Sequence, residues 1–290
     1  MTGLNLEQRQ IVELGGNRHL AYWQWGQGPN RLLLLHGLAD HGGIWASLAE
    51  QLSPNFQLIA PDLRGHGESS KPAQGYRCAE IIGDVQQLCE QLGWQDFHLL
   101  GHSWGGKLAC IWATQQPNSI QSLILVDPAF IASMPGWLKI TFPVLYRTLP
   151  FLKTMGPFAS RDAAVALAQT LKQYRGWSAF QAQVFDYSIE PKRDGPGEGQ
   201  WGSKFSPAAR DGIFTEMMAV DGLTQSLTLP SLLVLPEAGL NRMAWQLQPY
   251  RKYLQNLQEI RVPGNHWPFL VAPTVFNATV QAFLADVVAI

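Results

Sequence analysis

Residues 96–109 have the sequence Asp96-Phe97-His98-Leu99-Leu100-Gly101-His102-Ser103-Trp104-Gly105-Gly106-Lys107-Leu108-Ala109. The apolar run 97–100 predicts a short buried strand, and the apolar spacing from 104 onward predicts a helix. Ser103 lies between the two, with Gly101 and Gly105 on either side. Small residues are needed on such a turn because the strand and the helix approach too closely for side chains. The stretch therefore predicts a strand, a tight turn and a helix, with a serine at the turn.

A serine at this place is suited to a particular chemistry. The strained turn lifts its hydroxyl clear of the sheet, and the backbone N–H groups at the helix N-terminus favour negative charge. Both features suit a nucleophile whose reaction produces an oxyanion. The pentapeptide 101–105 alone also fits a tight turn whose serine has no chemical role. The rest of the chain has to distinguish these two interpretations.

The composition is that of one large α/β domain. The 290 residues, 46% of them hydrophobic, are enough to bury a sizeable core. The formal net charge is -1 and no dense basic run is present, which argues against nucleic-acid binding. No basic segment leads into an apolar one near Met1, and no apolar run is long enough to cross a bilayer. We expect neither a signal peptide nor a membrane span.

The cysteines indicate a reducing compartment. Cys78, Cys89 and Cys110 are odd in number, and their spacing is not that of a metal site. We expect them to be reduced core or near-core residues of a cytoplasmic protein. The serine chemistry described above requires neither a metal nor an organic cofactor, so we expect neither.

Strands and helices alternate on both sides of the serine turn. This alternation predicts a mostly parallel sheet with helices on both faces. The expected strands are 9–14, 18–25, 31–35, 56–60, 97–100, 120–126, 231–235 and 258–262. The expected helices of this part are 44–52, 77–92, one beginning near 104, 242–254 and 273–288.

The alternation stops over residues 128–225, where 161–175 and 178–188 resemble helices and 190–205 resembles an exposed loop. We interpret 128–225 as an inserted, mostly helical cap. The core is then formed by 1–127 and 226–290. Such a cap is expected over the strand ends, where open α/β sheets bind ligands.

A serine nucleophile needs a base, and His266 is the only histidine C-terminal to Ser103. It lies in a loop after the strand 258–262 and before the last helix. The order of serine, acid and histidine along the chain is that expected of such a triad. The alternative interpretation of His266 is a surface histidine without a catalytic role.

Four motifs stand in order along the chain: His36-Gly37, Pro61-Asp62-Leu63-Arg64-Gly65-His66-Gly67-Glu68-Ser69, Gly101-His102-Ser103-Trp104-Gly105-Gly106 and Gly264-Asn265-His266-Trp267. In these motifs the chain resembles the serine α/β-hydrolase superfamily, in particular its branch of capped esterases, perhydrolases and C–C bond hydrolases. Haloalkane dehalogenases and epoxide hydrolases of the same fold use an aspartate nucleophile, whereas this chain has Ser103.

The acid of the triad departs from the family pattern. The resemblance places it shortly after the strand 231–235, where this chain has Gly239. Two candidates remain: Asp127, at the end of the strand that follows the serine turn, and Glu237, two positions before Gly239. We favour Asp127, because some relatives have their acid there. A third interpretation is a site without a functional acid, since the acid orients the histidine and its loss need not abolish catalysis.

The resemblance also implies an oxyanion hole formed by the backbone N–H groups of Leu38 and Trp104. His36 is expected to be structural. Asp40 and His41 either border the pocket or lie in solvent.

Apolar and aromatic residues are dense over 130–158, with Lys139, Arg147 and Lys153 as the only charges. Three interpretations stand: packing of the cap on the core, an apolar roof over an acyl or aryl pocket, and a basic aromatic surface that contacts membrane lipid.

We expect a cofactor-independent serine hydrolase that acts on an apolar carboxylic ester through an acyl-enzyme. The alternatives are a C–C bond hydrolase or perhydrolase of the same fold, and a non-enzymatic small-ligand receptor or accessory protein.

Overall fold

A computed structural model describes residues 4–129, 131–133, 149–192 and 199–288. Its centre is an eight-stranded sheet with the order β1-β2-β4-β3-β5-β6-β9-β10. The pairs β1–β2 and β2–β4 are antiparallel, and every other neighbouring pair is parallel, which confirms the predicted mostly parallel sheet. The strands are β1 (Arg9–Glu13), β2 (His19–Trp25), β3 (Asn30–Leu35), β4 (Phe56–Pro61), β5 (Phe97–His102), β6 (Ile120–Val126), β9 (Ser231–Ala238) and β10 (Leu257–Asn265).

Helices cover both faces of the sheet, as predicted. Successive leucines of β3 point to opposite sides: Leu33 and Leu35 belong to one buried cluster, Leu32 and Leu34 to another. The first cluster contains residues of α2 (Cys78–Gln91), α3 (Trp104–Gln115) and α8 (Ala244–Tyr253). The second contains residues of α1 (Ala46–Leu52), α9 (Pro268–Val271) and α10 (Pro273–Val288).

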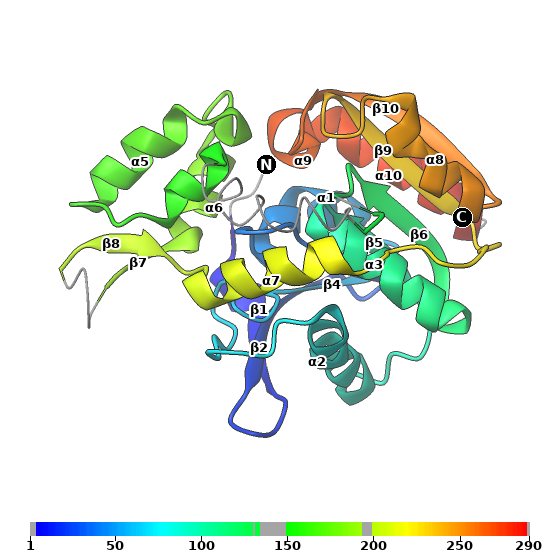
Figure 1. Ribbon diagram of the computed structural model, residues 1–290, viewed down its shortest axis with the longest axis horizontal. Coiled ribbons are helices and arrows are strands. Elements are labelled where there is room, and N and C mark those ends of the chain that lie inside the picture. The colour runs from blue at the N-terminus through cyan, green and yellow to red at the C-terminus, as the bar shows by residue number, and fades with distance from the viewer. Residues whose placement is uncertain (1–3, 130, 134–148, 193–198, 289–290) are drawn as a thin grey trace.

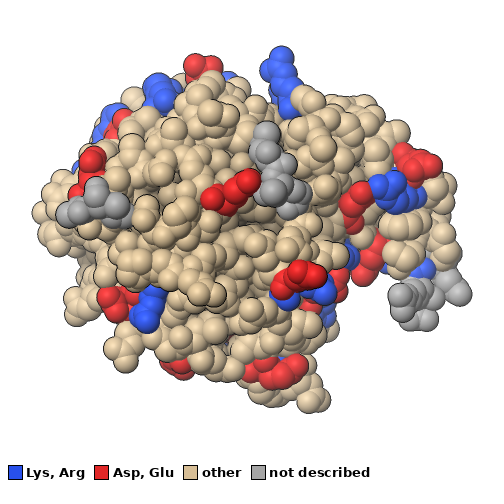
Figure 2. Space-filling model, turned by 180° about the vertical axis from the view of Figure 1, so that it is seen from behind, with Lys and Arg blue, Asp and Glu red and all other residues tan. Residues whose placement is uncertain are grey.

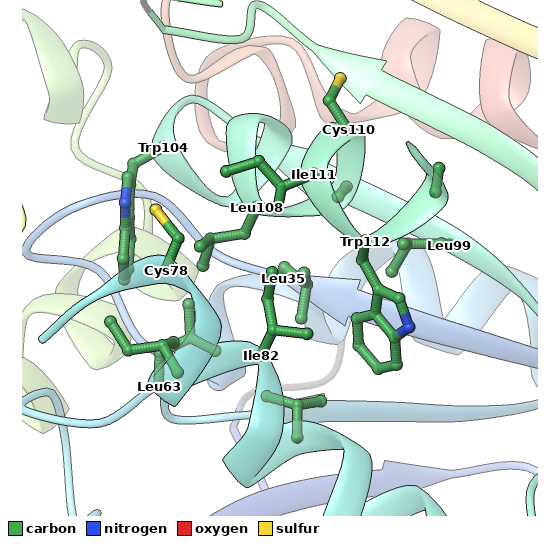
Figure 3. Packing of buried hydrophobic residues seen from close by; sticks show 14 of the residues in the cluster. Leu35, Leu63, Cys78, Ile82, Leu99, Trp104, Leu108, Cys110, Ile111 and Trp112 are labelled. Carbon is green, nitrogen blue, oxygen red and sulfur yellow. The ribbon is translucent and has the colours of Figure 1, made fainter. Parts of the chain in front are cut away.

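Helix α3 packs tightly beneath the serine turn. Figure 3 shows Trp104, Leu108 and Trp112 of α3 lying among Leu35 of β3 and Ile82 of α2. All five side chains are buried. This packing fixes the N-terminus of α3 against the end of β5, so the serine turn is held by the core on one side.

The turn between β5 and α3 depends on glycine. A Cβ atom on Gly101 would lie 2.3 Å from the carbonyl oxygen of Gly105, and one on Gly105 would lie 2.4 Å from that of His36. Ser103, between the two glycines, has φ 53° and ψ −117°, a conformation that non-glycine residues seldom adopt. The predicted tight turn with a strained serine is therefore present.

Between β6 and β9 the chain forms α5 (Arg161–Gln169), α6 (Ala179–Ser188), β7 (Ile189–Pro191), β8 (Trp201–Ser203) and α7 (Pro207–Ala219), with two 3-10 turns at Pro150–Met155 and Lys172–Tyr174. Figure 1 shows α5, α6 and the β7–β8 pair at one end of the molecule and α8, α9 and α10 near the other. The predicted helix 178–188 is confirmed. The division of the chain into core and cap stays a prediction.

Two predictions for this segment are wrong in part. The expected helix 161–175 ends at Gln169, and Leu171 is extended before the short turn that follows. The expected loop 190–205 contains β7 and β8, which pair in antiparallel fashion, while residues 193–198 of that loop lie outside the described residues. Each of these strands has only three residues, too few to show the alternation of a strand in the sequence.

Two further features of the described residues are the distribution of surface charge and the length of the helices. On the face shown in Figure 2, lysine and arginine side chains are interspersed with aspartate and glutamate, and wide uncharged areas separate them. None of the described helices is both long enough and apolar enough to cross a membrane.

We predict that Gly101→Ala lowers the free energy of unfolding by about 1–3 kcal/mol, because the new methyl group forces β5 and α3 apart. Gly83→Ala is the matched control. Gly83 lies inside α2 with no atom within 4 Å of an added Cβ, so this change raises the free energy of unfolding by about 0.5–1 kcal/mol. Urea unfolding measures both. A Gly101→Ala protein as stable as wild type would contradict the close approach.

Candidate active site

Three polar side chains meet at the carboxyl edge of the parallel strands. Ser103 follows β5, Asp127 follows β6 and His266 follows β10. The Ser103 hydroxyl lies 2.9 Å from His266 Nε2, and His266 Nδ1 lies 2.6 Å from Asp127 Oδ2. Because a carboxylate can only accept, Nδ1 carries the proton and Nε2 accepts from the hydroxyl. The structure thus brings these three predicted residues into one hydrogen-bonded chain.

Asp127 is buried and held by several donors. Its carboxylate accepts hydrogen bonds from the backbone N–H groups of Leu240 (2.7 Å) and Asn241 (3.1 Å) and from the Asn241 side chain (2.9 Å). Burial acts to raise the pKa of Asp127, but the hydrogen bond and charge of His266, together with these donors, hold the pKa below its ordinary value of 3.8. The side chain is therefore an ionised carboxylate at neutral pH.

Gly239 provides the space that Asp127 occupies. A Cβ atom on Gly239 would lie 2.5 Å from Asp127 Oδ2, closer than any side chain permits. The glycine at the position where the family pattern expects the acid thus makes room for a carboxylate that arrives from β6. Glu237, the other acid candidate, has an exposed side chain near the end of β9. Of the two candidates, Asp127 is the one that hydrogen-bonds to His266.

A cavity of about 210 Å³ opens over Ser103 and His266. Leu38 and Trp104, the residues expected to form an oxyanion hole, both line it. The other lining residues are Asp40, His102, Ala129, Leu149, Phe151, Phe214, Met217, Leu240 and Trp267. Most of these side chains are apolar, as suits an apolar substrate.

Some of the wall comes from residues that sequence reasoning missed. Phe214 and Met217 lie on α7, which the sequence analysis does not predict, although Ser206 and Pro207 are a helix-start signal and Ser206 accepts from the N–H of Ala209. Lys107 of α3 is buried and donates to the carbonyl oxygen of Met217. This bond ties α7 to the helix that begins at the serine turn.

The apolar stretch 130–158 contributes Leu149 and Phe151 to the wall. Phe130 and residues 134–148 lie outside the described residues, so the interpretation of this stretch as a lipid-contacting surface stays a prediction.

Asp40 borders the cavity and is buried. His41 is also buried, and its Nε2 lies 2.9 Å from the carbonyl oxygen of Val184. Of the two interpretations of Asp40 and His41, the solvent-exposed one is wrong.

His36 has a structural environment, as expected. Its Nδ1 donates to the Gly37 carbonyl, and its Nε2 accepts from the N–H of Leu63. Burial lowers the pKa of His36 to about 4, so the ring is neutral at neutral pH and can make both bonds. These bonds fix the backbone that leads to Leu38.

In the described part of the chain, no group of three or more His, Cys, Asp and Glu side chains is arranged to hold a metal ion.

Comparisons with known proteins identify relatives of several activities. Residues 30–273 match the model of a family described as alpha/beta hydrolase fold. The chain is 29% identical over 283 residues to a fluoroacetate dehalogenase of Burkholderia sp, an alignment that covers 90% of this chain and 88% of that protein. It is 34% identical over 115 residues to a soluble epoxide hydrolase of Corynebacterium sp., covering 39% of this chain and 38% of that protein.

Solved structures show the same fold. An E-2-(acetamidomethylene)succinate hydrolase superposes with a TM-score of 0.77 at 22% identity, covering 95% of this chain and 98% of that one. An esterase from a marine microorganism superposes with a TM-score of 0.71 at 21% identity, covering 91% of this chain and 98% of that one. Likeness at this level of identity concerns the fold alone.

We predict that Asp127→Asn destabilises the protein at neutral pH and that the difference from wild type shrinks in acid. The pKa of Asp127 is lower in the folded state, so its stabilisation is complete above 3.8 and is lost as the pH falls through the lower folded value. Urea unfolding from pH 7 to pH 3 measures this. Glu237→Gln is the control: the change is exposed, so its stability stays within about 0.5 kcal/mol of wild type at each pH.

Proposed function

Because the chain belongs to the alpha/beta hydrolase fold family, whose model matches residues 30–273, we propose that it is a serine hydrolase that cleaves a carboxylic ester through an acyl-enzyme. The observation that carries this proposal is the hydrogen-bonded chain from Ser103 through His266 to Asp127 at a mostly apolar cavity. A hydroxyl bonded to an imidazole, itself oriented by a buried carboxylate, is the arrangement that activates serine for attack on a carbonyl carbon.

In the first half of the proposed reaction, Ser103 Oγ attacks the ester carbonyl carbon while His266 Nε2 takes its proton. Asp127 holds the His266 Nδ1–H and stabilises the positive charge that develops on the ring. The depressed pKa of Asp127 keeps this carboxylate ionised throughout. The tetrahedral intermediate then collapses, His266 protonates the departing alcohol, and the acyl group stays on Ser103.

The oxyanion of this intermediate is proposed to bind the backbone N–H groups of Leu38 and Trp104. Both residues line the cavity beside Ser103, and Trp104 begins α3, whose N-terminus favours negative charge. One such donor contributes roughly 3 kcal/mol to transition-state stability in related chemistry. In the second half of the reaction, water replaces Ser103 as the nucleophile and His266 again acts as the base.

The identity of the nucleophile favours an ester over the substrates named for two relatives. Opening an epoxide or displacing a halide with a serine hydroxyl would leave an alkyl ether on Ser103. Water does not cleave such an ether readily, so the enzyme would turn over once. Attack on an ester gives an acyl-enzyme, whose carbonyl carbon accepts a second attack by water. Hydrolysis of an acyl compound is thus the reaction that Ser103 can complete.

The cavity also favours a neutral acyl group. None of the described residues that line it is lysine or arginine, and Asp40 adds a carboxylate. Moving a second carboxylate into this apolar space without a cationic partner costs several kcal/mol. Fluoroacetate and the acetamidomethylene succinate in the names of two similar proteins are carboxylates. We propose that the substrate of this chain differs from both in carrying no negative charge on its acyl part.

We predict that the protein hydrolyses p-nitrophenyl esters and that Ser103→Ala abolishes this turnover and labelling by a fluorophosphonate probe. The variant lacks the hydroxyl oxygen that is proposed to form the acyl-enzyme and that would bond to phosphorus. Initial rates across acyl chain lengths, with intact-mass spectrometry of the labelled protein, provide the measurement. Ser122→Ala, which alters a buried serine away from the cavity, is the control and stays reactive. A folded wild-type protein that neither turns over nor becomes labelled would rule out the proposal.

We predict a preference for p-nitrophenyl butyrate over mono-p-nitrophenyl succinate. The two acyl chains have the same length, but the second ends in a carboxylate where the first has a methyl group. The kcat/KM of the succinate is expected to be lower by at least about tenfold, because its charge would be buried without a partner. Steady-state kinetics on the wild-type protein tests this. Equal or better turnover of the succinate would contradict a neutral acyl site.

A further inference from the structure

Asp40 is a buried carboxylate at the cavity that the proposed reaction does not use. Only 5% of the residue is exposed. Its Oδ2 accepts a hydrogen bond from the Trp267 indole N–H at 3.2 Å, and its Oδ1 accepts one from the Gln173 side-chain amide at 3.0 Å. The His102 ring nitrogen Nδ1 lies 3.6 Å from Oδ2. Both carboxylate oxygens are therefore occupied by the protein, which leaves Asp40 little capacity to bind substrate directly.

Two of the three side chains around Asp40 are chain neighbours of the reacting groups. His102 directly precedes Ser103, and Trp267 directly follows His266. Asp40 itself lies two residues after Leu38, on the loop proposed to form the oxyanion hole. The hydrogen bond from Trp267 to Asp40 joins the histidine loop to the loop of Leu38, and the carboxylate lies beside the ring of His102 without a hydrogen bond to it.

His102 makes this connection tighter. Its Nε2 donates to the backbone carbonyl oxygen of His266 at 2.8 Å, so it links the serine turn to the histidine loop. The loop backbone is pressed against the same ring: a Cβ atom on Gly37 would lie 2.7 Å from His102 Nδ1 and 3.1 Å from Asp40 Oδ2. A shift of the carboxylate would therefore be transmitted to the backbone on both sides of the cavity.

We propose that Asp40 is a positioning residue that sets the distances among Ser103, His266 and the Leu38 N–H. This inference rests on the proposed serine-hydrolase function. Its physical basis is that a charged acceptor holds its hydrogen-bond donors more firmly than a neutral acceptor does. Transition-state geometry is sensitive to small displacements, and misplacement of a reacting group by about 1 Å costs on the order of 100-fold in rate.

Asp40→Asn provides the test, because it keeps the volume of the side chain, removes the charge and leaves one acceptor oxygen in place of two. We expect kcat to fall by about 10- to 100-fold with little change in KM. The rate constant for phosphonylation of Ser103 by a fluorophosphonate should fall in parallel. A role in stability alone would leave both rates unchanged in the folded fraction of the protein.

Asp84→Asn is the matched control. Asp84 is also a buried aspartate with charged partners, Arg18 and Arg64, but it lies on α2 and does not line the cavity. We expect this control to lose stability. Its kcat, corrected for the folded fraction by thermal unfolding and circular dichroism, stays within about twofold of wild type, because a change away from the site seldom moves the reacting atoms.

A second variant, Trp267→Phe, keeps a ring but removes the N–H donor to Asp40. The double variant with Asp40→Asn is expected to lose less activity than the product of the two single losses, because both act on one contact.

Should Asp40→Asn fail to fold, Trp267→Phe decides: a loss in kcat at constant KM supports the inference, and an unchanged kcat overturns it. Full labelling and turnover by folded Asp40→Asn also overturns it. Failure of wild type to be labelled would instead count against the proposed function.

Discussion

The close approach of β5 and α3 is the constraint on which the rest of the site depends. The Gly101 backbone meets the Gly105 carbonyl so closely that no side chain fits between them, and Ser103 is held at positive φ. The apolar side chains of α3 packed against α2 and β3 hold this strained turn in place. Since β6 and β10 run parallel to β5, their ends bring Asp127 and His266 to the same edge.

Much of this arrangement was predictable from the sequence, because its signals are local. The eight strands and the helices that alternate with them show clear apolar patterns, and Ser103 and His266 lie at the turns that the pattern assigns. Phe214 and Met217 were not predictable, since a cavity wall contributed by a helix over 100 residues away depends on tertiary packing. The β7–β8 pair was not predicted, because strands of three residues show almost no periodicity in the sequence. The described residues thus include elements with a clear local sequence pattern and elements whose place depends on tertiary packing.

Two buried aspartates support the site from different sides. Asp127 bonds to the His266 side chain, whereas Asp40 bonds to Trp267 and approaches His102, the neighbours of His266 and Ser103. Sequence reasoning favoured the first by its place at the end of a strand, where some relatives have their acid, and left the second open between the pocket border and solvent. The difference is physical: a direct partner of the base has a characteristic place after a strand, while a support residue is defined only by what folds around it.

The relation between Asp127 and Gly239 has a consequence for the history of such a chain. If an ancestor carried its acid at 239, no single substitution could transfer that role to 127. Gaining the second carboxylate first would crowd two like charges into a space that admits one, since even a Cβ at 239 lies 2.5 Å from Asp127 Oδ2. Losing the first would leave a histidine without its acid. In this chain the two acid positions therefore exclude each other, because Asp127 can keep its place only while residue 239 has no side chain.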